Sequence, residues 1–174
     1  ATVVDQIGTD FYYGDGLDVM SRFDTEFSGY KGGESGLLTV TDYTVILDGR
    51  SYEPGSPVGN YTVTPVFGTQ SLMNYVWETV TLSFTVARRP VTITVPNMSS
   101  VFGAEPDFYQ NVTVGETNNA GGAVLDHTAS DIVTLLAMDG EGEAIGTQSF
   151  AGDYVLKAAE ELRNANYEVT FVYT

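Results

Sequence analysis

Carboxylates are the first side chains in this chain to consider for chemistry, with 23 Asp and Glu among 174 residues. Paired carboxylates can act as general acids and bases or as glycosidase nucleophiles. Here acids occur along the whole sequence, and no pair recurs at matching positions outside turns. His127 is the one histidine, and nothing before it resembles the strained turn that presents a catalytic serine. The sequence therefore predicts a protein that is not an enzyme, with His127 in a solvated loop.

The best candidate for a metal site is an acid-glycine run at 139–143, which carries Asp139, Glu141 and Glu143. Acidic extracellular modules often bind Ca²⁺ through turn carboxylates and carbonyl oxygens. This run lacks the spacing and the closing bidentate Glu of an EF-hand loop, and a chain with no cysteine and one histidine cannot build a thiolate or multi-histidine site. We therefore expect a solvated hairpin turn, no metal and no cofactor, and name these three carboxylates as the calcium candidates.

Aromatic side chains raise a second possibility, a platform for sugar rings. Strand alternation places Tyr12 opposite Tyr13, which makes Tyr12 the better candidate for an exposed ligand-binding residue. The same parity directs Trp77 inward, so Trp77 is expected in the core. A following apolar set has the opposite parity, which predicts a bulge near 78–79 that lets both sets face the core; this set is Val80, Leu82, Phe84 and Val86.

The formal net charge of −16 excludes one class of partner, because only seven Lys and Arg oppose the 23 acids. Proteins bind nucleic acid by neutralising phosphates with basic side chains, so nucleic acid is not an expected partner. Anionic membrane surfaces are disfavoured for the same reason. The sequence has no run of 18 apolar residues, so we also expect no segment that spans a bilayer and no direct membrane contact.

An internal repeat organises the elements that must position these residues. Five landmarks recur in the same order: β-branched runs at 2–4 and 91–95, aromatic-Gly turns at 11–15 and 102–105, Asp-containing strands at 41–49 and 130–140, Gly-x-Tyr strands at 59–61 and 152–154, and Asn-Tyr pairs at 74–75 and 166–167. The repeat predicts two modules, 1–88 and 89–174. Because the joint has no Gly or Ser run, we expect it to be semi-rigid.

These landmarks resemble the YGX-type MBG repeats of bacterial surface and adhesin-like proteins. The resemblance rests on Tyr-Gly-Asp at 13–15, Gly-Asn-Tyr at 59–61, Asn-Tyr at 74–75 and Arg-Arg-Pro-Val-Thr-Ile-Thr at 88–94. It covers nearly all of both modules, although the second copy has Phe102 in place of the tyrosine. It implies small β-rich, β-grasp-like units in long extracellular tandem arrays, and it brings no catalytic residues.

The expected fold class is mainly β: two tandem small modules that are β-grasp-like, with immunoglobulin-like sandwich modules as the alternative. About five strands can be read in each module, against roughly seven in a sandwich, and the stretch 19–28 is the candidate for the helix that a β-grasp requires. The segment 155–165 has helical residue preferences, but its counterpart in the first copy does not. We therefore predict a strand through about Lys157 and at most one helical turn after it.

Together these features predict a non-catalytic tandem repeat segment of an extracellular bacterial cell-surface protein, acting as a stalk or as a module of an adhesin body. Its expected partners are neighbouring repeats of the same chain. The alternative function is a glycan- or mucin-binding adhesion module, whose partner would be host glycan or mucin. For either function, a surplus of negative charge spread over both repeats is suited to the exposed surface of a repeat array.

Overall fold

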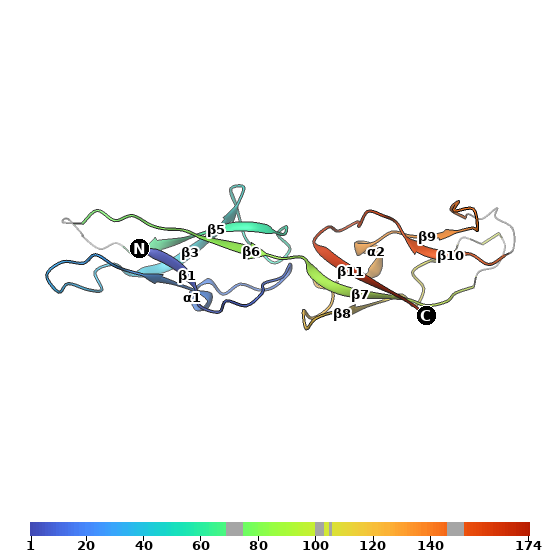
Figure 1. The fold of residues 1–174 in the computed structure, drawn as a ribbon, viewed down its shortest axis with the longest axis horizontal. Helices are drawn as coiled ribbons and strands as arrows, with labels where there is room; N and C mark the ends of the chain where they lie inside the picture. Colours follow the sequence, from blue (N-terminus) through green and yellow to red (C-terminus); the bar gives the residue numbers. More distant parts are fainter. Residues whose placement is uncertain (69–74, 100–102, 105, 146–151) are drawn as a thin grey trace. The chain divides into compact units, whose positions relative to one another are not determined.

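The computed structural model describes residues 1–68, 75–99, 103–104, 106–145 and 152–174. It divides the chain into two compact units, Ala1–Ala87 and Arg88–Thr174. The boundary between them is one residue before the 88/89 boundary expected from the sequence repeat. Both are mainly β, and the helices in their described parts are one turn each (Figure 1). In this part of the chain, no helix has the length and apolar character needed to cross a membrane.

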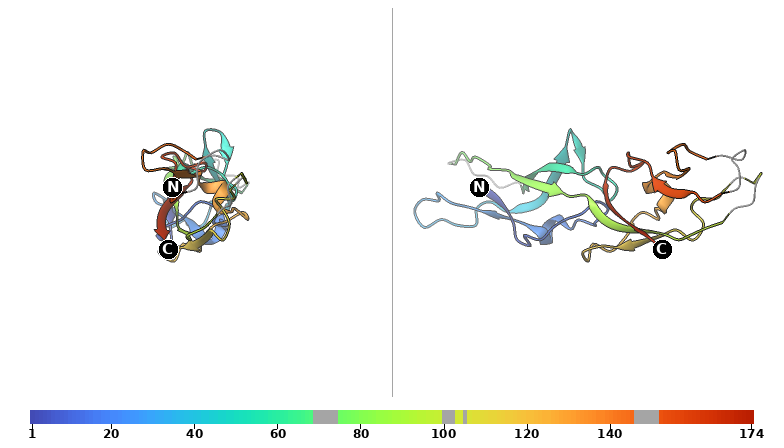
Figure 2. Two further views of the ribbon diagram at one scale, coloured as in Figure 1. Left: turned by 90° about the vertical axis from the view of Figure 1, so that its right-hand side faces the viewer. Right: turned by 45° about the vertical axis from the view of Figure 1, so that its right-hand side comes forward.

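Unit 1 contains a four-stranded antiparallel sheet and a separate antiparallel strand pair. The sheet has the order β4-β3-β5-β6, the pair is β1-β2, and β5 and β6 lie side by side in Figures 1 and 2. An isolated parallel bridge joins Thr2 in β1 to Val80, just before β6. The elements are β1 (Thr2–Asp5), α1 (Val19–Arg22), β2 (Phe23–Glu26), β3 (Val40–Leu47), β4 (Arg50–Ser51), β5 (Gly59–Phe67) and β6 (Leu82–Val86).

The core of unit 1 forms because its strands alternate apolar and polar residues. In β5, for example, Tyr61 and Val63 are buried while Thr62 between them is exposed. Aromatic rings fill the centre, with Phe84 in edge-on contact with Phe23 at 5.1 Å between centroids. The core residues are Val3, Phe11, Phe23, Tyr43, Val45, Tyr61, Val63, Phe84 and Val86.

A buried cation ties α1 to β1 in unit 1. Arg22 is only 7% exposed, and its Nη2 lies 2.9 Å from Asp5 Oδ2 and donates to the Thr9 carbonyl at 2.7 Å. Its guanidinium also lies over the ring of Phe84, 4.9 Å from the centroid. Because the charge is paired and stacked on an aromatic face, its burial is compensated.

Unit 2 contains a three-stranded mixed sheet and a separate antiparallel pair. The sheet has the order β11-β7-β8, with β11 parallel and β8 antiparallel to β7, and the pair is β9-β10. Its elements are β7 (Arg89–Val95), β8 (Thr113–Glu116), α2 (Ala129–Ile132), β9 (Leu135–Met138), β10 (Val155–Ala158) and β11 (Tyr167–Tyr173).

The core of unit 2 is mostly aliphatic. The central strand β7 buries Val91, Ile93 and Val95, and β11 contributes Tyr167, which is 0% exposed. The short helix α2 is held by a capping box between Thr128 and Asp131, and it directs Ile132 into the core.

Several local predictions can be compared with these elements. The strand predicted through about Lys157 is confirmed as β10, and no helix follows it in the described residues. The helix expected over 19–28 is one turn, because Phe23–Glu26 alternates buried and exposed side chains and pairs with β1. The prediction that Val80 faces the core is wrong, since Val80 is 57% exposed. Phe102 and Asn74, which carry two of the repeat landmarks, lie outside the described residues.

Candidate functional site

The acidic run in unit 2 forms a closed turn. Asp139 Oδ1 accepts hydrogen bonds from the backbone amides of Glu141 and Glu143, both at 2.9 Å, and the Asp139 amide donates to the Glu143 carbonyl at 2.9 Å. The side chains of Glu141 and Glu143 are exposed. Across the described residues, no group of three His, Asp or Glu could hold a metal ion. The structure thus does not bring the three calcium candidates together as a ligand set.

Tyr12, the candidate for sugar contact, is half-buried, and its neighbour Tyr13 is buried. The two side chains therefore differ in exposure in the predicted sense. The Tyr12 amide donates to Asp15 Oδ2 at 2.9 Å, its hydroxyl donates to Asp10 Oδ2 at 3.3 Å, and its backbone bridges to Ala87. Tyr12 is tied into the loop that leads to α1 and does not form an isolated platform.

The expectation that Trp77 lies in the core is wrong, because its side chain is 45% exposed. Residues 75–79 form no strand, so strand parity cannot direct the side chain. Its ring contacts Phe67 edge-on at 6.1 Å, and ring contacts continue through Phe27 and Tyr30 to Tyr75. Trp77 is the exposed end of an aromatic chain in unit 1.

Tyr75, at the other end of this chain, hydrogen-bonds through its hydroxyl to the carboxylate of Glu34. The hydroxyl also accepts from the Lys31 amide at 3.2 Å. The hydrogen bond to Glu34 raises the pKa of Tyr75, because it favours the protonated phenol. These contacts fix the Gly-rich loop around Lys31 against the aromatic chain.

His127 lies in a loop, as predicted, but it is half-buried. Its Nδ1 is 2.8 Å from the hydroxyl of the buried Tyr167. The same hydroxyl donates to the Val124 carbonyl and accepts from the Val124 amide, both at 3.2 Å. Nearby, hydrogen bonds from the Thr128 side chain and amide lower the pKa of Asp131. These contacts hold the loop before α2 in place.

A hollow in unit 1 was not anticipated from the sequence. It begins at a two-residue turn where Asp48 and Gly49 have φ of 48° and 77°, the left-handed pair that a type I′ hairpin requires. The turn places Arg50 directly across from Leu47 in the β3-β4 pairing. Cross-strand partners share a face of the sheet, so the Arg50 side chain leaves the strand on the same face as Leu47.

The chain then wraps over this end of the sheet in a second turn. Gly55 has a φ of 99° after Pro54, as in a type II turn, and the Ser56 amide donates to the Glu53 carbonyl at 2.8 Å. The Tyr61 hydroxyl donates to the Pro57 carbonyl at 2.7 Å. The resulting hollow of about 960 Å³ is open to solvent and is lined by Leu47, Asp48, Arg50, Ser51, Glu53, Pro54, Gly55, Ser56, Pro57 and Tyr61.

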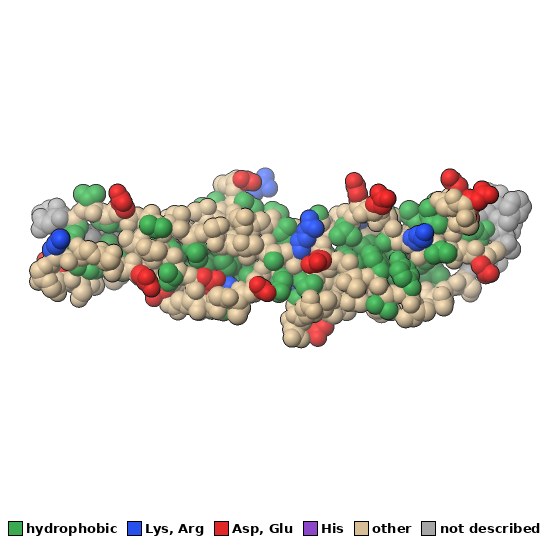
Figure 3. Space-filling view, viewed as in Figure 1, with side chains coloured by type: hydrophobic (Ala, Val, Ile, Leu, Met, Phe, Trp, Pro, Cys, Tyr) green, Lys and Arg blue, Asp and Glu red, His purple; other side chains and the backbone are tan. Residues whose placement is uncertain are grey.

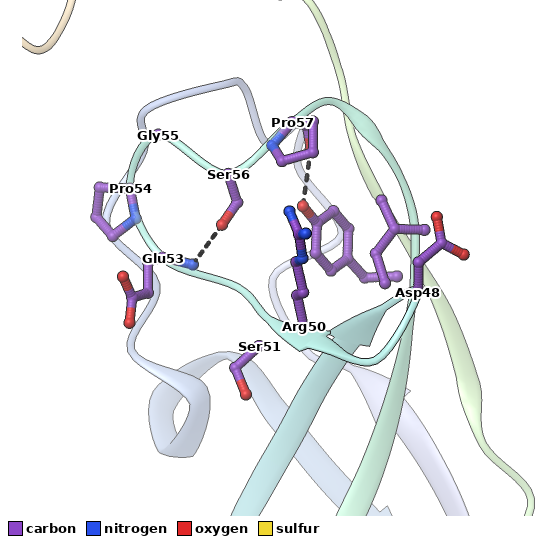
Figure 4. A pocket seen from close by; sticks show the side chains of 10 residues that line it. Asp48, Arg50, Ser51, Glu53, Pro54, Gly55, Ser56 and Pro57 are labelled. Atoms are coloured by element: carbon purple, nitrogen blue, oxygen red, sulfur yellow. Dashed lines mark hydrogen bonds between the residues drawn. The ribbon is translucent and has the colours of Figure 1, made fainter.

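Figure 4 shows how the charged side chains of this loop are directed. The guanidinium of Arg50 points into the ring that the loop encloses, whereas the carboxylates of Asp48 and Glu53 point away from it. The sequence signals for this hollow are the Asp-Gly and Pro-Gly pairs, which predict turns but not what the turns enclose.

Comparisons with protein-family models, with curated proteins and with solved structures find no match for this chain.

Proposed function

We propose that this chain is a non-catalytic tandem-repeat segment of an extracellular bacterial surface protein, in which each unit is a stalk or adhesin-body module. The observation that carries the proposal is a shared pattern of strand pairing in the two units. Each unit also has its own apolar core, as a module in an array requires. Neighbouring repeats of the same chain are the proposed partners.

The shared pattern involves the first, second and last strands of each unit. β1 pairs antiparallel with β2, and β7 pairs antiparallel with β8. The last segment runs parallel to the first strand in both units, at the Thr2–Val80 bridge and along β11 and β7. Adjacent parallel terminal strands, with α2 between β8 and β9, favour the β-grasp-like class over an immunoglobulin-like sandwich, which has about seven antiparallel strands and no helix.

The absence of catalysis is supported by what causes the shifted pKa values. Burial acts to raise the pKa of Asp5, but the hydrogen bond from Arg22 and those from the Ile7 and Gly8 amides lower it overall. Burial raises the pKa of Tyr61. The lowered pKa of Asp5 arises from contacts that hold a loop in place, the raised pKa of Tyr61 arises from burial, and the two groups belong to different parts of unit 1.

The extracellular surface location is consistent with the distribution of charge. On the face drawn in Figure 3, acidic side chains are scattered over both units and do not gather into one patch. A net charge of −16 spread in this way would keep neighbouring arrays apart and soluble.

Single-molecule force spectroscopy tests the stalk proposal. A polyprotein containing this chain should show two unfolding events per copy, each releasing roughly 300 Å of chain, since the units have equal length and an extended residue spans about 3.5 Å. One event of about twice that length, or no resistance to force, would refute two independent modules. Antibody labelling of intact cells that express the parent protein tests the surface location.

Host glycan or mucin binding is the second candidate, and the exposure of Trp77 favours it. Because Trp77 is the single tryptophan, its fluorescence reports on that surface alone. Titration with mucin oligosaccharides should quench or shift the emission if sugars stack on Trp77, and an unchanged spectrum would count against this candidate.

A further inference from the structure

Arg50 differs from Arg22 and Arg163 because its guanidinium has no partner among the described residues. Arg22 is paired with Asp5, and Arg163 donates to the Ser130 carbonyl and to Thr134 Oγ1. In the part of the chain that the structure describes, the guanidinium of Arg50 makes no ion pair or hydrogen bond, although Asp48 and Glu53 are within three residues of it. An exposed cation that points into a hollow, with its nearest acids turned away, is suited to recognise an anion.

The hollow also holds this cation in a defined position. Arg50 sits directly after the type I′ turn and across from Leu47, so the start of its side chain is fixed by the β3-β4 pairing. The floor is rigid, since Tyr61 is 2% exposed and its hydroxyl is bonded to the Pro57 carbonyl. The wall is a closed turn in which Ser56 Oγ accepts from the Glu53 amide at 2.9 Å. A preformed site of this kind needs little reorganisation when a ligand binds.

The chemistry of the lining defines the ligand. A guanidinium offers a planar fork of donors that matches a carboxylate in two parallel hydrogen bonds. The hollow of about 960 Å³ is much larger than a free carboxylate ion needs and falls in the usual range for small-molecule sites. Its walls combine the ring carbons of Pro54 and Pro57 with polar backbone and Ser56, and it stays open to water. This lining suits a hydroxylated ring more than an apolar body.

We propose that the hollow formed by residues 48–57 binds a sugar that carries a carboxylate, with Arg50 as the residue that recognises the acid group. The site is independent of the stalk role and lies wholly within unit 1. Asp48 and Glu53 keep the local field from being strongly positive, and the chain as a whole carries −16. We therefore expect weak, roughly millimolar binding of a single sugar, strengthened in a polymer by repeated contacts.

Three probe ligands distinguish the contribution of the carboxylate to binding from that of the sugar ring. The full chain, labelled with ¹⁵N, is titrated with methyl β-glucuronide, with methyl β-glucoside and with acetate, each to about 20 mM, several times the expected Kd. The glucuronide should shift the Arg50 Nε signal and the amides of the 53–57 turn. The glucoside has the same ring without the carboxylate, and acetate has the carboxylate without the ring, so both should bind at least about tenfold more weakly.

Matched variants then test Arg50 itself. R50Q should weaken glucuronide binding by about tenfold or more, and R50K by less, because lysine keeps the charge but loses the fork. R88Q is the control, since Arg88 is exposed and the substitution removes the same charge; it should change binding by less than about twofold. Arg50 is exposed, so its variants should fold, and the amide spectrum of unit 1 verifies this.

Several results would overturn the proposal. No shift with the glucuronide would remove the site. Equal binding of the glucoside would remove the role of Arg50, and equal binding of acetate would remove the sugar. Equal weakening by R50Q and R88Q would mean that only long-range charge matters.

Discussion

The two units differ in how their last strand is joined to the rest of the sheet. In unit 1, β6 pairs with β5, and the flanking bridges at Val80 and Ala87 link the same stretch to Thr2 and Tyr12. In the described part of unit 2, β11 pairs with β7 only, and β10 pairs with β9 only. One repeat pattern therefore yields two sheets that an isolated bridge connects in unit 1, and two small sheets without such a bridge in the described part of unit 2.

The length of the middle strand explains this difference. β5 has nine residues and reaches both β3 and β6, whereas β10 has four. β5 is rich in Val, Thr and Tyr, which favour strands, while β10 runs into Ala-Ala-Glu-Glu at 158–161, residues depleted in strands. The repeat therefore specifies which strands pair with the first strand, and local composition decides how far the sheet extends.

The two units also differ in the residues that fill their cores. Unit 1 packs Phe11, Phe23 and Phe84 with centroids about 5 Å apart and caps them with Arg22. Unit 2 relies on aliphatic residues around Tyr167. A substitution in one core should therefore lower the unfolding stability of that unit and leave the stability of the other unit unchanged.

Removal of a central ring should have the largest effect. Phe84→Ala should destabilise unit 1 by about 3–5 kcal/mol, because Phe84 is 3% exposed and contacts two other rings and Arg22. Urea unfolding followed by Trp77 fluorescence measures unit 1, and amide signals of β7 measure unit 2. Val66→Ala in the same sheet is the control, since Val66 is 39% exposed and should change stability by about 0.5 kcal/mol or less. Simultaneous loss of both units would contradict their independence.

The matching change in unit 2 should be smaller. Tyr167→Phe keeps the buried ring but removes the hydroxyl that satisfies the Val124 amide and carbonyl and His127 Nδ1. Buried polar groups without partners cost about 1–3 kcal/mol, so the unfolding midpoint of unit 2 should fall while that of unit 1 stays constant. Tyr173→Phe is the control in the same strand, because Tyr173 is 53% exposed. If the two variants behave alike, the Tyr167 hydroxyl has no structural role.

Acid should lower the stability of unit 1 and unit 2 by different amounts, and this difference should be smaller than the effects of the two substitutions above. The folded pKa of Asp5 lies below its ordinary value of 3.8, so the Arg22–Asp5 pair stabilises unit 1 fully above that value. This stability is lost as the pH falls from about 4 through the lower folded pKa. Asp5→Asn should remove this part of the pH dependence and leave that of unit 2 unchanged. Identical acid profiles for the wild type and D5N would show that the pair adds nothing.

The sequence predicted the features that depend on alternation within one strand. The β-branched run at 91–95 lies in β7 and buries every second residue. The repeat also corrected a helical preference, since it predicted the strand that is β10. These features follow from residue order over a few positions, which a sequence displays directly.

The features that sequence reasoning missed depend on contacts between distant residues. Strand parity directs Trp77 into the core, but no strand passes through residues 75–79 and the side chain is exposed. The burial of Arg22 depends on Asp5, 17 residues away. The hollow around Arg50 depends on two turns that close over the end of a sheet, and neither turn alone indicates which side chain points inward. Composition and periodicity carry no information on contacts between residues that are far apart in the sequence.

Hydrogen exchange of the backbone amides should distinguish β5 from β10, although the differences in free energy that it measures are the smallest. β5 and β10 occupy corresponding places in the repeat, but β5 lies between two strands and β10 beside one. β5 buries Tyr61, Val63 and Pro65, whereas Val155 in β10 is 58% exposed. Local opening needs less free energy where few apolar contacts and few hydrogen bonds must break.

The amides of β10 should therefore exchange at least about tenfold faster than those of β7, the better packed strand in the other sheet of unit 2. A difference of about 1.4 kcal/mol in opening free energy is a factor of ten. In unit 1, the amides of β5 that face β3 and those that face β6 should both be protected, because each set has a partner strand. Hydrogen exchange read by NMR resolves the individual strands. Equal protection of β10 and β7 would mean that unit 2 opens as one cooperative piece, and the contrast between a connected and a divided sheet would then have no energetic consequence.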